Sequence, residues 1–170
     1  SPPKWHLAHT TWFFEAFILT QYLTDYKVYH PQFDYLFNSY YETVGKPFPR
    51  AQRGLLSRPT VEEIFQYRLY VDDAITELMK QSGSYKDGKL EFLIELGLNH
   101  EQQHQELLYT DIKHIFAFNP LRPVYKQHTK PPVQQPEEYR WLDIPAGTYY
   151  IGSEQNRFSY DNEGPRHRVL

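Results

Sequence analysis

The amino-acid sequence predicts a mainly helical protein, with a four-helix bundle in residues 1–118. Three observations predict this organisation. Apolar residues recur every three or four positions through residues 1–118, as they do on the buried face of a helix. Residues 119–138 are rich in proline and have no period, which indicates a linker. From residue 139 to residue 170 the pattern becomes strand-like.

The first two expected helices each show an apolar stripe. The stripe of the first contains His9 among Trp5, Ala8, Trp12, Phe13, Ala16, Leu19 and Leu23. The second helix is expected to follow Pro31 and to end at Gly45, with apolar positions at Phe33, Leu36, Phe37, Tyr40, Tyr41 and Val44. Residues 46–59 contain several prolines and basic residues and are expected to form a loop.

The third and fourth expected helices complete the bundle. Thr60 and Glu63 have the spacing of a capping box, which predicts a helix start there. The buried stripe of this third helix is expected at Ile64, Tyr67, Val71, Ala74, Ile75 and Leu78. A turn is expected from Ser82 to Gly88, with Asp87 as a possible cap, before a fourth helix from Lys89 to Phe118. The apolar positions of the fourth helix include Leu93, Leu96, Leu107, Leu108, Ile112 and Ile115.

Composition excludes several classes of protein. The chain has 170 residues and no cysteine, so neither a disulfide framework nor a cysteine-based zinc site is possible. The net charge is -3 without a block of lysine or arginine, which disfavours nucleic acid as a partner. No apolar run has the length of a membrane span, and no signal peptide opens the chain. We therefore expect a cytoplasmic protein that uses no membrane. The ends of the sequence lead us to expect a fragment of a longer protein.

Histidine spacing gives the sharpest functional signal. His100 and His104 are four residues apart, so on a helix they share one face and can bind one metal ion. Spacing alone also permits a chance pair. His9 lies on the apolar stripe of the first helix, where a neutral imidazole needs a partner, and a three-histidine site becomes the better interpretation. His6 is expected at the edge of that stripe, and His114 lies about 15 Å beyond His104 along the axis.

The residues leave the metal and the chemistry open. Three imidazoles without a carboxylate suit zinc, iron, nickel or copper. The string from His100 to His104 also matches the zinc-protease motif, in which Glu101 would be the general base. Arg50 and Arg53 are three residues apart and could grip a substrate carboxylate, but sequence alone favours two solvated loop arginines.

Several segments resemble one family in the family's own order. They are Pro3–Glu15, with the string PKWHLAHTTWFFE, Pro49–Pro59, with PRAQRGLLSRP, and Leu98–Leu107, with LNHEQQHQEL. These resemble the DinB-like domain of ergothioneine-biosynthesis sulfoxide synthases, the EgtB family. Ile144–Gly152 and Asp161–Val169 resemble the start of the formylglycine-generating-enzyme (sulfatase-modifying-factor) domain, a mixed α/β C-lectin-like fold that follows in the same proteins.

The resemblance implies an enzyme with a non-haem Fe(II) centre. Family members use O2 to join a thiol, γ-glutamylcysteine or cysteine, to C2 of hercynine, and the product is a sulfoxide. Carried onto this chain, the ligands are His9, His100 and His104. Arg50 and Arg53 would hold carboxylates of the thiol substrate, and Gln103 would touch hercynine.

The resemblance also implies what lies outside the chain. The family's catalytic tyrosine acid and most of its hercynine contacts belong to the remainder of the C-terminal domain, beyond Leu170, and that remainder is the expected partner. The isolated chain is therefore expected to be inactive. The alternatives are a sister synthase of the ovothiol or selenoneine pathway, a DinB-like zinc hydrolase or thiol transferase, and a non-catalytic bundle with structural histidines.

Overall fold

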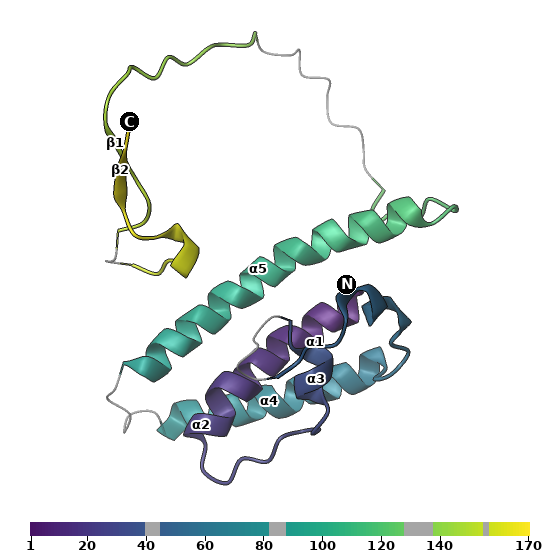
Figure 1. Cartoon of the computed structure of the whole chain (residues 1–170). Coiled ribbons are helices and arrows are strands. Elements are labelled where there is room, and N and C mark those ends of the chain that lie inside the picture. Colours follow the sequence, from purple (N-terminus) through teal and green to yellow (C-terminus); the bar gives the residue numbers. More distant parts are fainter. Residues whose placement is uncertain (40–44, 82–87, 128–137, 155–156) are drawn as a thin grey trace. The chain divides into compact units, whose positions relative to one another are not determined.

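The computed structural model describes residues 1–39, 45–81, 88–127, 138–154 and 157–170. These residues form two compact units, Ser1–Pro123 and Val124–Leu170, and each is described by itself. The structure is mainly helical, with one two-stranded sheet among the described residues, which confirms the predicted class (Figure 1). The boundary at Pro123 lies within the proline-rich stretch predicted as a linker.

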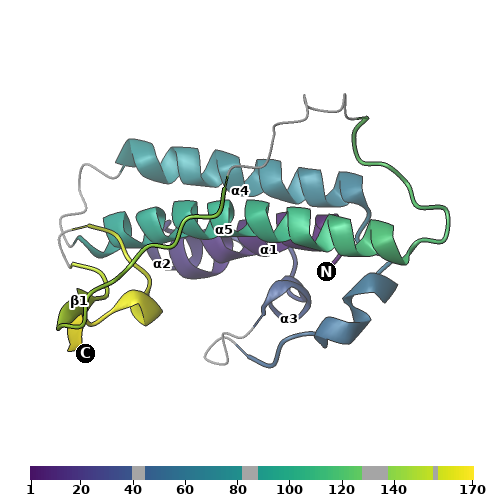
Figure 2. The same cartoon turned by 90° about the horizontal axis from the view of Figure 1, so that it is seen from above.

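The first unit is built around its N-terminal helix, α1 (Pro3–Phe14). The helix continues through a π-helical segment, η1 (Glu15–Leu19), into a last turn, α2 (Thr20–Tyr22). Helix α1 packs against both α4 (Val61–Gln81) and α5 (Lys89–Phe118), and the three run side by side in Figures 1 and 2. Most of its residues are buried for this reason, and a side chain on α1 meets two other helices at once.

The π-helical segment begins at a buried carboxylate. Glu15 is 2% exposed and accepts hydrogen bonds from the Tyr26 hydroxyl (2.7 Å), the Tyr67 hydroxyl (2.5 Å) and the Tyr29 backbone N–H (2.8 Å). These donors satisfy the carboxylate in place of water. Glu15 therefore ties α4 and the loop after α2 to the end of α1.

The second expected helix is much shorter than the sequence predicts. Helix α3 spans only Phe33–Phe37, and Asn38 already has extended backbone angles (φ -62, ψ 147). The reason is that α1 takes the terminal carbonyls: Trp5 Nε1 donates to Leu36 O, and His9 Nδ1 donates to Phe37 O. The other expected positions, Tyr40 to Val44, lie outside the described residues.

Helix α4 agrees with the predicted start and stripe. The Thr60 backbone N–H donates to Glu63 Oε2 (2.5 Å), and the Glu63 N–H donates to Thr60 Oγ1 (3.2 Å), which is the expected capping box. Its buried residues are Ile64, Tyr67, Val71 and Leu78, with Ala74 and Ile75 half-buried. The preceding loop contains a 3-10 helix, η2 (Arg50–Leu55), which the sequence did not predict. Asp87 and most of the expected turn lie outside the described residues.

Helix α5 has the predicted bounds, but its buried face is narrower than predicted. Leu90, Gly97, His100 and His104 are its buried residues. Two apolar positions assigned to the stripe are exposed, Leu107 by 42% and Ile115 by 40%. The prediction was wrong for these two positions: α5 has no buried residue after His104. None of the helices in the described ranges combines the length and apolar character needed to cross a membrane.

The second unit contains a small antiparallel sheet. Strand β1 (Tyr149–Ile151) pairs with β2 (His167–Val169), with Tyr150 opposite Arg168, and a short 3-10 helix, η4 (Asp161–Glu163), precedes β2. The strand-like pattern before β1 does not form a strand. Trp141 is 97% exposed and Leu142 86% exposed, because no other described strand pairs with this segment.

Candidate metal centre

Three histidines converge in the first unit. His9 comes from α1, and His100 and His104 come from successive turns of α5. One nitrogen from each ring can be chosen so that all three lie within 4.8 Å of one another. Two imidazoles bonded to one tetrahedral ion place their nitrogens about 3.4 Å apart, given bonds of about 2.0–2.1 Å. The structure thus brings together the three predicted ligands, and small ring movements would close them around an ion.

The site is buried and walled by aromatic rings. The exposed fractions are 1% for His9, 4% for His100 and 9% for His104. The His9 ring stacks between Trp5 (ring centroids 4.7 Å apart) and Trp12 (5.6 Å), and Phe13 packs against His100 (4.9 Å). A glycine in α5 permits this approach: a Cβ on Gly97 would lie 2.7 Å from Phe14 Cζ.

Hydrogen bonds leave coordinating lone pairs free. Because a carbonyl can only accept, His9 Nδ1 carries the proton in its bond to Phe37 O, and its Nε2 has a free lone pair. Neither ring nitrogen of His100 has a hydrogen-bond partner among the described residues, although both are buried. An unsatisfied buried polar group costs about 1–3 kcal/mol. A metal ion would give this ring the partner that it lacks.

Electrostatics keeps the cluster neutral. Burial lowers the pKa of His9 to about 2, with the neighbouring histidines adding to the effect. Burial likewise lowers the pKa of His104 to about 3 and that of His100 to about 4. All three rings are therefore uncharged at neutral pH, and neutral imidazole is the form that coordinates a metal.

His6 lies deeper than the sequence predicts. It is 4% exposed, and its Nδ1 is 2.9 Å from His104 Nδ1 while its Nε2 is 2.7 Å from Asp111 Oδ2. His6 is buried at the edge of the α1 stripe because α5 packs over that edge. The available signal was positional: His6 precedes His9 by one helical turn, and Asp111 follows His104 by two turns.

Of the three predicted substrate-binding residues, the structure brings one to the cluster. Arg53 is 4% exposed, with its guanidinium carbon 3.6 Å from the centroid of the Trp5 ring that also stacks on His9. Its Nη1 donates to Ser1 Oγ (3.2 Å), its Nε has no partner in the described part of the chain, and burial lowers its pKa to about 10. The solvated state favoured by sequence alone is therefore wrong for Arg53, whereas Arg50 and Gln103 are exposed.

Glu101 is directed toward α4. Arg68 on α4 holds its carboxylate, with Nη2 donating to Oε1 (3.1 Å). A general base of a metal-activated water needs its carboxylate free to accept a proton from that water. In this conformation Glu101 is therefore not available as the general base that the zinc-protease interpretation requires.

A groove of about 40 Å³ between α1 and α5 reaches His6 and His104 and gives the cluster a narrow opening.

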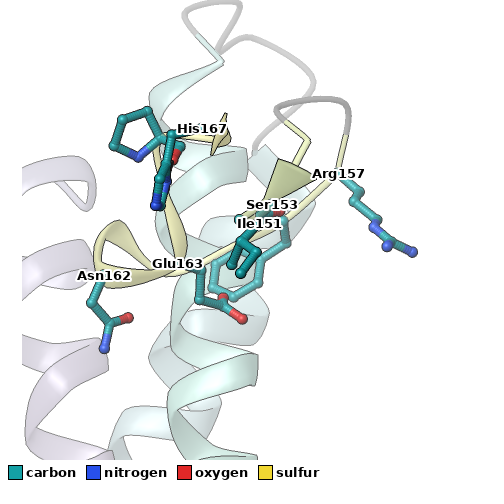
Figure 3. Close-up of a pocket in the computed structure, with 10 residues that line it drawn as sticks. Ile151, Ser153, Arg157, Asn162, Glu163 and His167 are labelled. Atoms are coloured by element: carbon teal, nitrogen blue, oxygen red, sulfur yellow. Dashed lines mark hydrogen bonds between the residues drawn. The ribbon is translucent and has the colours of Figure 1, made fainter. Parts of the chain in front are cut away.

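The second unit has an open hollow of about 700 Å³, and its lining includes none of the three proposed metal ligands. Residues of β1, η4 and β2 line it, and in Figure 3 the Arg157 side chain points away from the other labelled residues. His167, on its rim, uses Nδ1 to donate to Pro165 O (2.9 Å). No predicted site residue lies in this hollow.

The fold and the cluster define the first unit as a helical protein unit with a buried, neutral three-histidine cluster of the kind that can hold a metal. A scan of known family models finds no match to the chain, and a search of curated proteins finds none either.

Proposed function

We propose that this chain carries the iron-binding part of an O2-dependent sulfoxide synthase of ergothioneine biosynthesis, which joins γ-glutamylcysteine or cysteine to C2 of hercynine. The observation that carries the proposal is the convergence of His9, His100 and His104 as buried neutral rings with free lone pairs. Three imidazoles support a transition-metal site. The motifs around them, which resemble the EgtB family, favour iron.

The proposal assigns finer identities to the two units. Residues 1–118 would be a DinB-like bundle in which α3 takes the place of a full second helix, and 119–138 would be the linker. Residues 139–170, with β1 and β2, would begin the C-lectin-like domain of formylglycine-generating enzymes. The catalytic tyrosine and most hercynine contacts are proposed to lie beyond Leu170.

A ferrous ion held by the three imidazoles would supply the redox chemistry that activates O2. The chain's own residues prepare the site for it. Trp5, Trp12 and Phe13 exclude water from the buried side of the cluster, which strengthens electrostatic interactions there. Three protein ligands leave coordination positions open for small molecules.

Arg53 places a cation beside this site. Its guanidinium stacks on Trp5, and Trp5 stacks on His9, so the charge lies one ring away from a proposed ligand. A buried guanidinium whose Nε has no partner within the described ranges favours a carboxylate. A carboxylate is the group that γ-glutamylcysteine and cysteine both carry. Arg50, on the same 3-10 helix, is proposed as a second contact, and Gln103 on α5 as a hercynine contact.

The rival functions differ in their metal or their donor. A zinc hydrolase or thiol transferase would use the same three imidazoles, and hydrolysis is disfavoured by the Arg68–Glu101 pair. Ovothiol or selenoneine pathway synthases would differ only in the sulfur or selenium donor. A structural role for the histidines is disfavoured by His100, whose nitrogens bond to nothing in the described residues.

Metal analysis of anaerobically purified chain tests the proposal. We expect one Fe(II) per chain on titration, loss of binding in His9→Ala, and unchanged binding in His114→Ala, since His114 is exposed on the same α5. Tight zinc with no uptake of iron would favour a hydrolase or thiol transferase. Failure to bind either metal would leave a structural bundle and contradict the proposal.

A turnover assay with hercynine, γ-glutamylcysteine and O2 tests the proposal that this chain binds the metal but lacks the catalytic tyrosine and most hercynine contacts. We expect the iron-loaded chain to form little sulfoxide, because orientation of reactants accounts for about 7–11 kcal/mol of a barrier. A missing proton donor typically lowers a rate by about 10²–10⁴-fold. Rapid sulfoxide formation by this chain would show that the residues proposed beyond Leu170 are dispensable.

A further inference from the structure

A buried chain of hydrogen bonds runs from Asp111 through His6 to His104. Asp111 and His104 both belong to α5, and His6 reaches them from α1. The His6 Nε2 is 2.7 Å from Asp111 Oδ2, and the His6 Nδ1 is 2.9 Å from His104 Nδ1. Both nitrogens of His6 are thus engaged, and its ring is outside the group of three that can share an ion.

The direction of each hydrogen bond follows from the charge states. Burial raises the pKa of Asp111, but its hydrogen bonds outweigh that effect, so the carboxyl is ionised at neutral pH. A carboxylate only accepts, and His6 Nε2 is therefore the donor. The His6 ring is 4% exposed, and burial of this degree favours the uncharged form of the ring. A neutral His6 protonated on Nε2 has a lone pair on Nδ1.

The consequence falls on His104. Because His6 Nδ1 can only accept, the proton in the His6–His104 contact belongs to His104 Nδ1. His104 then keeps its Nε2 lone pair free, which is the same tautomer that Phe37 O imposes on His9. Metal-bound histidines commonly donate their second ring N–H to a fixed acceptor, and loss of that acceptor lowers metal affinity about 10–100-fold.

We propose that His6 is a positioning residue for the metal ligand His104: oriented by Asp111, it accepts the Nδ1 proton of His104 and so holds the Nε2 lone pair toward the site. The inference rests on the proposed metal centre and deepens it. Helix α1 then contributes to the centre in two ways. It supplies the ligand His9, and one turn earlier it supplies His6, the acceptor that sets the tautomer of His104 on α5.

The first test needs no substitution. Long-range ¹H–¹⁵N NMR spectra of the metal-free chain report which ring nitrogen of each histidine is protonated. We expect His104 as the Nδ1–H tautomer and His6 as the Nε2–H tautomer. A His104 ring protonated on Nε2, or a His6 ring protonated on Nδ1, would overturn the inference whatever metal the chain binds.

The second test measures affinity for Zn(II) and Co(II) by competition with a chelator in the full chain. His6→Phe keeps a ring of similar size but removes the acceptor, and we expect about 10–100-fold weaker binding. His6→Asn retains an acceptor oxygen close to the position of Nδ1 and should recover most of the affinity. His114→Phe makes the same exchange at an exposed position of α5 and should change nothing.

The outcomes separate the two claims. If the unaltered chain binds neither Zn(II) nor Co(II), the metal centre and the role of His6 both fail. If it binds either ion and folded His6→Phe binds equally well, only the positioning role fails. If His6→Phe does not fold, the comparison of His6→Asn with the unaltered chain, together with the tautomer of His104, decides the question.

Discussion

At the scale of single residues, the cluster is defined by where each imidazole keeps its proton. His9 Nδ1–H donates a hydrogen bond to the backbone carbonyl of Phe37, whereas both nitrogens of His100 lack a partner among the described residues. Such a group is held in place by the packing around it, and the aromatic rings of α1 provide that packing. The buried His100 nitrogens are therefore energetically unfavourable in the metal-free chain, and a bound ion would remove this unfavourable free energy.

The lowered pKa values predict acid sensitivity of the metal-free chain. The folded-state pKa values, about 2 for His9, about 3 for His104 and about 4 for His100, lie below the ordinary histidine value of about 6.5. The unfolded chain therefore binds more protons between these limits, and the free energy of unfolding falls as pH decreases below about 6.5. Each histidine contributes a slope of up to about 1.4 kcal/mol per pH unit.

Urea unfolding of the metal-free chain between pH 7.5 and pH 4.5 (about the window set by these shifts) checks this prediction. His100→Gln removes one titrating ring, so its slope should be shallower than that of the unaltered chain. His114→Gln, at an exposed position, should leave the slope unchanged. A free energy of unfolding that is constant over this pH range would show that burial does not keep the three histidine rings neutral.

Substitution of Arg50 tests substrate recognition without disturbing the fold, because the side chain is exposed. Replacing this exposed residue with alanine should leave the fold intact. In Co(II)-loaded chain, we expect Arg50→Ala to weaken binding of γ-glutamylcysteine by about 10-fold or more, the loss of a charge-assisted hydrogen bond. Binding of 2-mercaptoethanol, a thiol without carboxylates, should not change. Equal weakening for both thiols would remove the proposed carboxylate contact.

The sequence predicted the three converging histidines because their spacing follows the helical period and their stripes are apolar. It did not predict the burial of His6 or of Arg53. For Arg53 the reason is that a loop residue has no period to read, and its burial depends on stacking over Trp5 from a distant helix. Charged loop residues are usually solvated, and here the aromatic face of Trp5 reversed that expectation.

At the scale of secondary-structure elements, the approach of α1 to α5 depends on Gly97. Alanine there would favour the helix by about 1 kcal/mol, but its Cβ would lie 2.7 Å from Phe14 Cζ and 3.2 Å from Phe13 Cε1. Overpacking of this kind costs about 1–3 kcal/mol. We therefore expect Gly97→Ala to be destabilised and to bind metal more weakly, since α1 and α5 must separate.

Chemical denaturation and a chelator competition measure both effects. Gly54→Ala is the matched control, because a Cβ at Gly54 meets nothing within 4 Å and its backbone is not left-handed. Adding Phe14→Leu to Gly97→Ala should recover part of the loss, which a double-mutant cycle would reveal as coupling. A Gly97→Ala variant more stable than the unaltered chain would show that Phe14 yields without cost.

The elements were predicted unevenly for a physical reason. Helices α4 and α5 have their predicted starts because a capping box and a long amphipathic period are local signals. Helix α3 stops at Phe37 because Trp5 and His9, far away in the sequence, occupy its last carbonyls. Strand β1 forms only where β2 pairs with it. Tertiary partners of this kind leave no periodic signal in their own segment.

At the scale of the whole molecule, all ligands of the proposed centre fall within the first unit. His9, His100 and His104 precede the boundary between Pro123 and Val124. A chain ending at Pro123 should therefore bind Zn(II) with the affinity of the full chain, because no described residue of the second unit belongs to the cluster. Isothermal titration of both chains measures this. A large loss on truncation would show that the second unit contributes to the centre.

X-ray absorption of the chain loaded anaerobically with one equivalent of Fe(II) tests the central claim most directly. The account predicts a first shell with three imidazole nitrogens at about 2.0–2.2 Å, and a shell with fewer imidazoles in His100→Ala but not in His114→Ala. A first shell of oxygen atoms without imidazole scattering would contradict it, as would a spectrum that His100→Ala leaves unchanged.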